Sequence, residues 1–174
     1  MSNDGRLVQI TTFRPAAREG HDARRQAECV RLLRNEVSDN LTRSQSNKEI
    51  TADDQWTWWR SPDALAREII IVETCTVEEP DPVFVGFGMI QIVENQGWLT
   101  GAIRQQHRGK GHGRALFRRL LQECRVRNLV PWLEVFADNE VAKALYVSLG
   151  FQWRDCYGGP GVRRILVGQF VGVV

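Results

Sequence analysis

The segment HRGKGHGRAL, residues 107 to 116, places three glycines at alternate positions directly before a run with helical periodicity. Glycine inside a helix costs about 1 kcal/mol relative to alanine, and it is the residue that most easily adopts a left-handed backbone. Gly109, Gly111 and Gly113, with basic residues between them, therefore predict a tight turn at the start of a helix. Such a turn suits a phosphate or pyrophosphate, because backbone N–H groups and the positive end of the helix converge on one point.

Two common phosphate-binding patterns compete for this turn. A P-loop needs Ser or Thr after its lysine, but Lys110 is followed by Gly111, so that pattern is absent. A dinucleotide-binding fingerprint needs a third glycine where Arg114 stands, although Glu134 follows at the distance of a ribose-binding acid. That fingerprint also belongs to the first turn of a parallel sheet, whereas this turn follows several predicted strands. The place of the turn in the chain therefore weakens the dinucleotide-binding interpretation but does not exclude it.

Hydrophobic periodicity predicts an α/β fold. Alternating and β-branched runs predict strands at Leu7–Phe13, Ile69–Val72, Val83–Val93, Gly97–Ile103, Val130–Phe136, Phe151–Cys156 and Val162–Val173. Apolar spacings of three or four predict helices over Asp22–Val37, after a capping box at Thr51–Asp54, over Ala115–Cys124 and over Val141–Leu149. We expect one domain, residues 1–174, with a mixed, mostly antiparallel sheet of about seven strands and about four helices.

Charge and composition exclude several classes of partner. The formal net charge is only +2, which is too small to argue for nucleic acid as the main partner. No apolar run approaches the roughly 20 residues that a bilayer span needs, so we expect a cytoplasmic protein that binds no membrane. The four cysteines form no CxxC pair, and we assign neither a disulfide nor a metal site.

Two segments resemble the GNAT family of N-acetyltransferases. The run from Arg108 to Gly113 matches the family's (Q/R)xxGx(G/A) signature, and Gly101–Ile103 stands where its cofactor strand runs. A second signature, N-x-x-A-x-x-L-Y-x-x-x-G-F, resembles Asn139, Ala142, Leu145, Tyr146, Leu149, Gly150 and Phe151. The resemblance implies the family's fold and acetyl-CoA as the acyl donor.

The resemblance also implies roles for individual residues. The donor would be held by Ala102, Ile103, Arg108, Gly109, Lys110, Gly111, His112, Gly113, Arg114 and Asn139. Tyr146 would be the general acid facing the cofactor sulfur. Glu134, twelve residues earlier, is spaced like the base of the ribosomal-protein alanine acetyltransferases, with Glu94 or water as alternatives. Asn139 can also serve as a helix N-cap.

These residues predict an N-acetyltransferase that moves an acetyl group from acetyl-CoA to a primary amine by direct attack in a ternary complex. The acceptor would be a small amine, an amino sugar or a peptide amine. The segment Leu33–Glu36 with Ile50, Thr51 and the tryptophans that follow is similar to members acting on nucleotide-linked amino sugars and on protein N-termini. The alternative is a non-catalytic acyl-CoA-binding module of the same fold. A homodimer and the acyl-chain length are left open.

Overall fold

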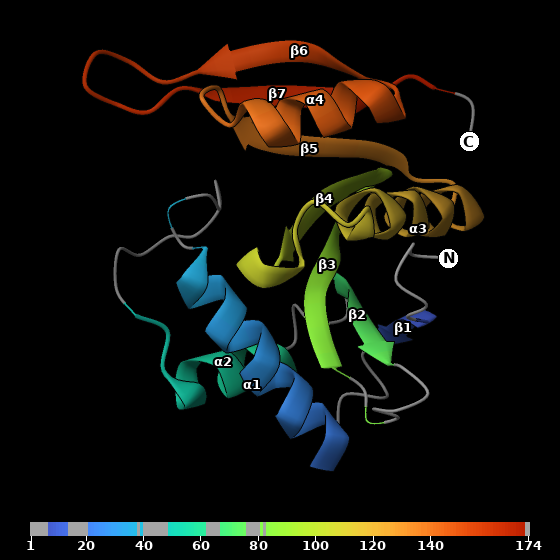
Figure 1. Ribbon diagram of the computed structural model, residues 1–174. Coiled ribbons are helices and arrows are strands. Elements are labelled where there is room, and N and C mark those ends of the chain that lie inside the picture. The colour runs from blue at the N-terminus through green and yellow to red at the C-terminus, as the bar shows by residue number, and fades with distance from the viewer. Residues whose placement is uncertain are drawn as a thin grey trace.

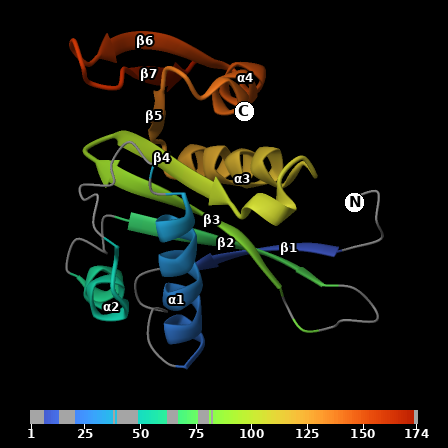
Figure 2. The same cartoon turned by 60° about the vertical axis from the view of Figure 1, so that its left-hand side comes forward.

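The computed structural model describes residues 7–13, 21–37, 39, 49–61, 67–75, 81 and 83–172. These residues form one mixed sheet with helices on both of its faces (Figures 1 and 2). The elements are β1 (Leu7–Phe13), α1 (His21–Glu36), α2 (Ala52–Arg60), β2 (Arg67–Cys75), β3 (Val83–Val93), β4 (Gln96–Ile103), the 3-10 turn η4 (Gln105–His107), α3 (His112–Val126), β5 (Val130–Phe136), α4 (Glu140–Leu149), β6 (Phe151–Tyr157) and β7 (Ile165–Phe170). The predicted order of strands and helices is confirmed.

Three segments differ from the prediction or cannot be compared with it. β2 is longer than the predicted Ile69–Val72, since its pairing with β1 and β3 extends beyond the β-branched run. β7 begins at Ile165 rather than Val162, because the residues before it form the turn after β6. The predicted loop at residues 38–48 lies outside the described residues, apart from residue 39. In the part of the chain that is described, no helix is long and apolar enough to cross a membrane.

One interruption in the sheet positions the site. The strand order is β1-β2-β3-β4-β5-β7-β6, and β4 with β5 is the parallel pair. Their pairing runs from Gln96↔Val130 to Leu99↔Leu133, yet β4 continues to Ile103 and β5 to Phe136. Beyond Leu99 and Leu133 the facing edges of β4 and β5 are no longer paired with each other. The sheet therefore opens at the carboxyl ends of its two parallel strands.

Helix α3 covers the sheet on one side of this opening. Leu116 and Leu120 are fully buried against the strands, which confirms the predicted apolar face of α3. Glycines in the strands allow the close approach: a Cβ at Gly88 would lie 2.7 Å from Leu116, and one at Gly101 would lie 3.0 Å from Phe117. Helix α3 is thus held close to β3 and β4, with its N-terminus beside the end of β4.

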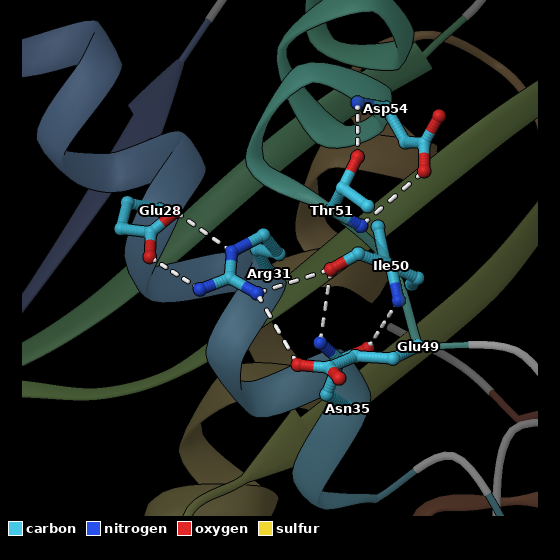
Figure 3. Close-up of polar contacts among 7 residues, drawn as sticks. All are labelled: Glu28, Arg31, Asn35, Glu49, Ile50, Thr51 and Asp54. Atoms are coloured by element: carbon cyan, nitrogen blue, oxygen red, sulfur yellow. Dashed lines mark hydrogen bonds and ion pairs between the residues drawn. The ribbon is translucent and has the colours of Figure 1, made fainter.

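Helices α1 and α2 lie on the opposite face and meet at a polar corner (Figure 3). The side-chain amide of Asn35 donates to the carbonyl of Ile50 (3.1 Å), and the N–H of Ile50 donates to Asn35 Oδ1 (3.0 Å). Arg31 donates to the same carbonyl at 3.0 Å. Thr51 and Asp54 then form the predicted capping box at the start of α2. The corner is therefore closed by side chains of α1 that bond to backbone groups.

The tryptophans of α2 take part in this packing. Trp59 is fully buried in the cluster between α1, α2 and the sheet. The guanidinium of Arg24 lies 4.7 Å from the ring centroid of Trp56, and that of Arg34 lies 4.7 Å from the ring centroid of Trp58. Stacked cations of this kind stabilise an aromatic surface modestly. The rings are therefore engaged with the chain's own side chains.

The corner predicts an effect on stability. Asn35→Ala removes both hydrogen bonds to Ile50 and should lower the free energy of unfolding by about 1–2 kcal/mol. Glu49→Ala, at an exposed neighbouring side chain, should change it by less than about 0.5 kcal/mol. Urea unfolding followed by circular dichroism measures both. Equal effects of the two substitutions would contradict a structural role for Asn35.

Candidate active site

A cavity of about 510 Å³ lies where β4 and β5 separate. Its walls come from β4, β5, the turn before α3, the N-terminal part of α3, and α4. The sequence-predicted residues that line it are Ala102, Ile103, Arg108, Gly109, Gly111, His112, Gly113, Arg114, Glu134, Asn139 and Tyr146. Lys110 is exposed and is not among the lining residues. Segments far apart in the sequence thus meet around one space.

The open strand edges give this cavity backbone hydrogen-bonding groups. β4 pairs with β3 along its other edge, and β5 pairs with β7 from Trp132↔Gln169 to Phe136↔Ile165. The edges that face each other beyond Leu99 and Leu133 therefore have no strand between them. An extended ligand that carries amides can bond to such edges, as an added strand does.

The three glycines of the turn have different reasons to be glycine. Gly109 (φ +74°) and Gly111 (φ +84°) have left-handed backbone conformations, which side-chain-bearing residues rarely adopt. Gly113 is helical, and a Cβ there would make only ordinary contacts, the nearest at 3.6 Å from Leu145. Both Leu145 and Ile103, the next neighbour, line the cavity. The absence of a side chain at Gly113 thus leaves space in the cavity itself.

The start of α3 offers an anion-binding end. Gly111 is its N-cap and supplies no side-chain cap, and the first backbone bond within the helix runs from Ala115 N to Gly111 O (3.1 Å). The amides of Gly113 and Arg114 precede that bond, and such amides have no partner within a helix. They carry the positive end of the helix dipole. Arg108 donates from Nε to the Ile103 carbonyl (3.0 Å), which ties the turn to the end of β4.

Tyr146 reaches the cavity from α4. Its side chain is 8% exposed, and its ring packs against Phe117 (4.8 Å between centroids) and Phe151 (6.0 Å). Burial raises the pKa of the Tyr146 phenol well above its ordinary value. The phenol, which carries its proton at neutral pH even when exposed, is thus held more firmly in its neutral form. Asn139 caps α4, accepting from Ala142 N at 3.2 Å, so the predicted N-cap role is confirmed.

Glu134 lies on the face of β5 away from α3. Its neighbours Leu133 and Val135 are buried in the cluster that contains α3. Strand alternation puts Glu134 on the other face, with Trp132 and Phe136 on either side of it along the strand. The Trp132 ring stacks on Trp98 at 5.8 Å between centroids. The carboxylate therefore stands between two aromatic positions at the edge of the cavity.

The alternative base, Glu94, lies elsewhere. It occupies the β3–β4 turn with φ +54°, next to the Val93↔Gln96 pair that closes this hairpin. The cavity lies at the opposite end of β4, around Ile103. Glu94 is not among the residues that line the cavity, and its position removes it as a substitute for Glu134.

Sequence analysis missed several lining residues. His107 is 6% exposed, lines the cavity and has its ring 6.4 Å from that of His112. The one sequence signal that could have identified His107 is that it comes directly before the glycine turn. Val37, at the end of α1, also lines the cavity, and nothing local in the sequence connects it to the turn. Among the described residues, no group of three or more His, Cys, Asp or Glu side chains could hold a metal ion.

Comparison with known proteins now identifies the family. The sequence model of the acetyltransferase (GNAT) family matches residues 31–151, which is most of the chain. The chain belongs to this family. The resemblance seen in the two sequence signatures is thereby confirmed, and so is the fold that it implied.

Relatives of known name match a shorter stretch. The [ribosomal protein bS18]-alanine N-acetyltransferase of Salmonella typhimurium is 38% identical over 73 residues, 41% of this chain and 49% of that protein. Its counterpart in Escherichia coli K12 is 40% identical over 67 residues, 37% of this chain and 45% of that protein. The chain thus matches about half the length of these relatives.

Solved structures share the fold over nearly the whole chain. A candidate acetyltransferase from Salmonella typhimurium, solved with acetyl-CoA, has a TM-score of 0.71 and 16% identity, covering 94% of this chain and 92% of that one. The ribosomal-protein-alanine N-acetyltransferase of Brucella melitensis has a TM-score of 0.71 and 17% identity, with coverage of 92% and 98%. At these identities the similarity establishes the fold alone.

The glycine turn gives a paired test. Gly111 and Gly161 both have positive φ (+84° and +78°), and at both a Cβ would meet nothing within 4 Å. Gly111→Ala and Gly161→Ala should therefore cost similar stability, about 1–2 kcal/mol. Only Gly111 lines the cavity, so only Gly111→Ala should weaken coenzyme A binding, by several-fold in calorimetric titration. Equal binding by the two variants would contradict a ligand at this turn.

Proposed function

We propose that this protein is an acetyl-CoA-dependent N-acetyltransferase whose acceptor is a peptide α-amine. The observation that carries the proposal is that the glycine turn, the open edges of β4 and β5, Tyr146 and Glu134 all line one cavity. Family membership supports the reaction class. The named relatives, which act on the alanine of a ribosomal protein, favour a peptide acceptor over a small amine or an amino sugar.

The residues of the cavity fit coenzyme A. The amides at the start of α3 and the turn Gly109–Gly111 would hold its pyrophosphate. The N–H of Ile103, on the edge of β4 that faces the opening, would bond an amide of its arm. Ala102 would contact the arm from the cavity wall, and Asn139 would approach it from α4. When bound, acetyl-CoA supplies an acetyl thioester, whose C–S bond breaks as a C–N bond to the acceptor amine forms.

The acceptor's pKa affects how much help the protein must give. A lysine-like amine with a pKa near 10.4 is neutral in fewer than about one part in a thousand at pH 7, which is a deficit of about 4–5 kcal/mol. A peptide α-amine, with a pKa of about 7.7–8.0, is neutral in about one part in ten. A single carboxylate is therefore a sufficient base for a peptide acceptor. Glu134 is the carboxylate that the cavity offers for this role.

Two side chains of this chain would move the protons. Glu134, directly or through a water, accepts the proton that the amine loses. Tyr146 would donate its phenolic proton to the departing thiolate as the C–S bond breaks, because a phenol carries its proton at pH 7, and the phenolate would then regain a proton from water. Orientation of the amine in the opening would supply much of the remaining acceleration.

Tyr146→Phe separates catalysis from binding. Phenylalanine keeps the packing against Phe117 and Phe151, so the dissociation constant for coenzyme A should not change. The turnover number should fall by about 10²-fold or more, because the proton donor is lost. Tyr157→Phe, at an exposed tyrosine of β6, is the matched control and should change neither quantity.

The outcomes of this experiment distinguish the proposal from its alternative. An unaltered turnover number in Tyr146→Phe would contradict the role of Tyr146. Tight coenzyme A binding by the unmodified protein, with no thiol release across peptide N-termini, polyamines and amino sugars, would instead indicate a non-catalytic acyl-CoA-binding module.

Glu134→Gln tests the base through its pH dependence. Below the pKa of the peptide amine the acceptor is mostly protonated, so loss of the base should reduce kcat/KM strongly. Above about pH 8 the amine is already neutral, and the defect should shrink. Glu94→Gln, in the distant turn, is the control and should match the unmodified protein at every pH. A Glu134→Gln defect that is constant across pH would show that Glu134 is not the base.

A further inference from the structure

We infer, on the basis of the proposed function, that Glu36 is a positioning residue that fixes the donor-binding turn to the end of α1. Glu36 is the last residue of α1, and Gln105 begins η4, 69 residues later. The backbone N–H of Gln105 donates to Glu36 Oε1 at 2.8 Å. Glu36 Oε2 lies 3.7 Å from Nε of Arg104. The side chain thus contacts two successive residues directly after β4.

The bonded N–H is one that the turn cannot satisfy alone. Within η4 the backbone bonds run from His107 N to Arg104 O (2.9 Å) and from Arg108 N to Gln105 O (3.2 Å). The N–H of Gln105 precedes these bonds and has no acceptor within the turn, so Glu36 or solvent must accept from it at this exposed residue. Arg104 offers no side-chain cap to η4. Glu36 therefore acts as the cap of this turn, supplied by another helix, and its negative charge suits that end.

The turn that Glu36 caps leads directly into the donor site. Its last residue, His107, is buried in the cavity, and the next residue, Arg108, lines it as well. Gly109 then begins the glycine turn. A shift of Gln105 would therefore move the start of the phosphate-binding turn relative to the free edge of β4. By holding Gln105, the Glu36 carboxylate fixes the position of the glycine turn relative to the edge of β4.

The contact between Glu36 and Gln105 also gives a structural role to the end of α1, which the proposed mechanism does not use. In the run Leu33–Glu36, Asn35 holds Ile50 at the α1–α2 corner, while the adjacent Glu36 holds Gln105. The following residue, Val37, lines the cavity. The end of α1 thus joins the corner shown in Figure 3 to the turn that carries the donor site.

The test measures coenzyme A binding to the full chain by calorimetric titration, together with KM and kcat. Glu36→Ala should raise the dissociation constant for coenzyme A and the KM for acetyl-CoA by about tenfold, the effect of one lost hydrogen bond to a charged group. The turnover number at saturation should change by less than about twofold. Glu36→Gln retains an oxygen that accepts from Gln105 and should recover most of the affinity.

A matched control and a reciprocal variant complete the design. Glu28→Ala, an acid on the same helix that bonds Arg31, should leave coenzyme A binding unchanged. Gln105→Pro removes the donor N–H, and proline is accepted at the first position of a helical turn. Arg104, with φ −54° and ψ 140°, already has a backbone compatible with a following proline. Gln105→Pro should weaken binding like Glu36→Ala, and the double variant should be no weaker than either, because both remove the same bond.

The inference and the proposed function fail in different ways. Unmodified protein that does not bind coenzyme A would overturn the proposed function. If the unmodified protein binds coenzyme A and Glu36→Ala has the same dissociation constant, only the role of Glu36 is overturned. Additive losses in the double variant would also overturn it, because they would show that Glu36 and Gln105 act separately. A lowered turnover number with unchanged KM would place Glu36 outside donor positioning.

Discussion

The early end of the pairing between β4 and β5 is the constraint on which the site depends. A parallel pair of strands normally satisfies both backbones along its full length. Here the pairing stops at Leu99↔Leu133 while both strands continue. The opening leaves two strand edges with hydrogen-bonding capacity, and a ligand with amides can take the place of the missing neighbour. Side chains from both faces of the sheet line this opening, Tyr146 from α4 and Glu134 from the opposite face of β5.

The surrounding helices keep this opening in place. Small residues in the strands, Gly88 and Gly101 among them, let α3 pack closely, and this packing sets the glycine turn beside the end of β4. On the other face, α1 is fixed to α2 by Asn35 and to η4 by Glu36. The glycine turn is therefore held from both faces of the sheet. Gly109 and Gly111 adopt the left-handed conformations that the turn needs, and Gly113 leaves space in the cavity. The packing of α3 and α1 fixes where the turn lies.

Local patterns were sufficient to predict much of this arrangement. The capping box at Thr51, the bounds of β3 and the apolar face of α3 follow from spacing and residue type, since each depends on neighbours close in the sequence. The glycine turn was predictable for the same reason. The positions of Glu36, Val37 and His107 near the glycine turn depend on how distant segments pack, which periodicity does not encode. The position of Glu94 away from the cavity follows from hairpin register, which sequence spacing alone does not reveal.

Hydrogen–deuterium exchange of the full chain, with and without coenzyme A, tests the central claim most directly. If the opening and the turn hold the donor, coenzyme A should slow exchange at the amides of Thr100–Ile103 on β4 and of His112–Arg114 at the start of α3. Amides of β1 and β2, far from the opening in the strand order, should be unaffected. Binding of coenzyme A without protection at these two segments would contradict the account, since the ligand would then be held elsewhere.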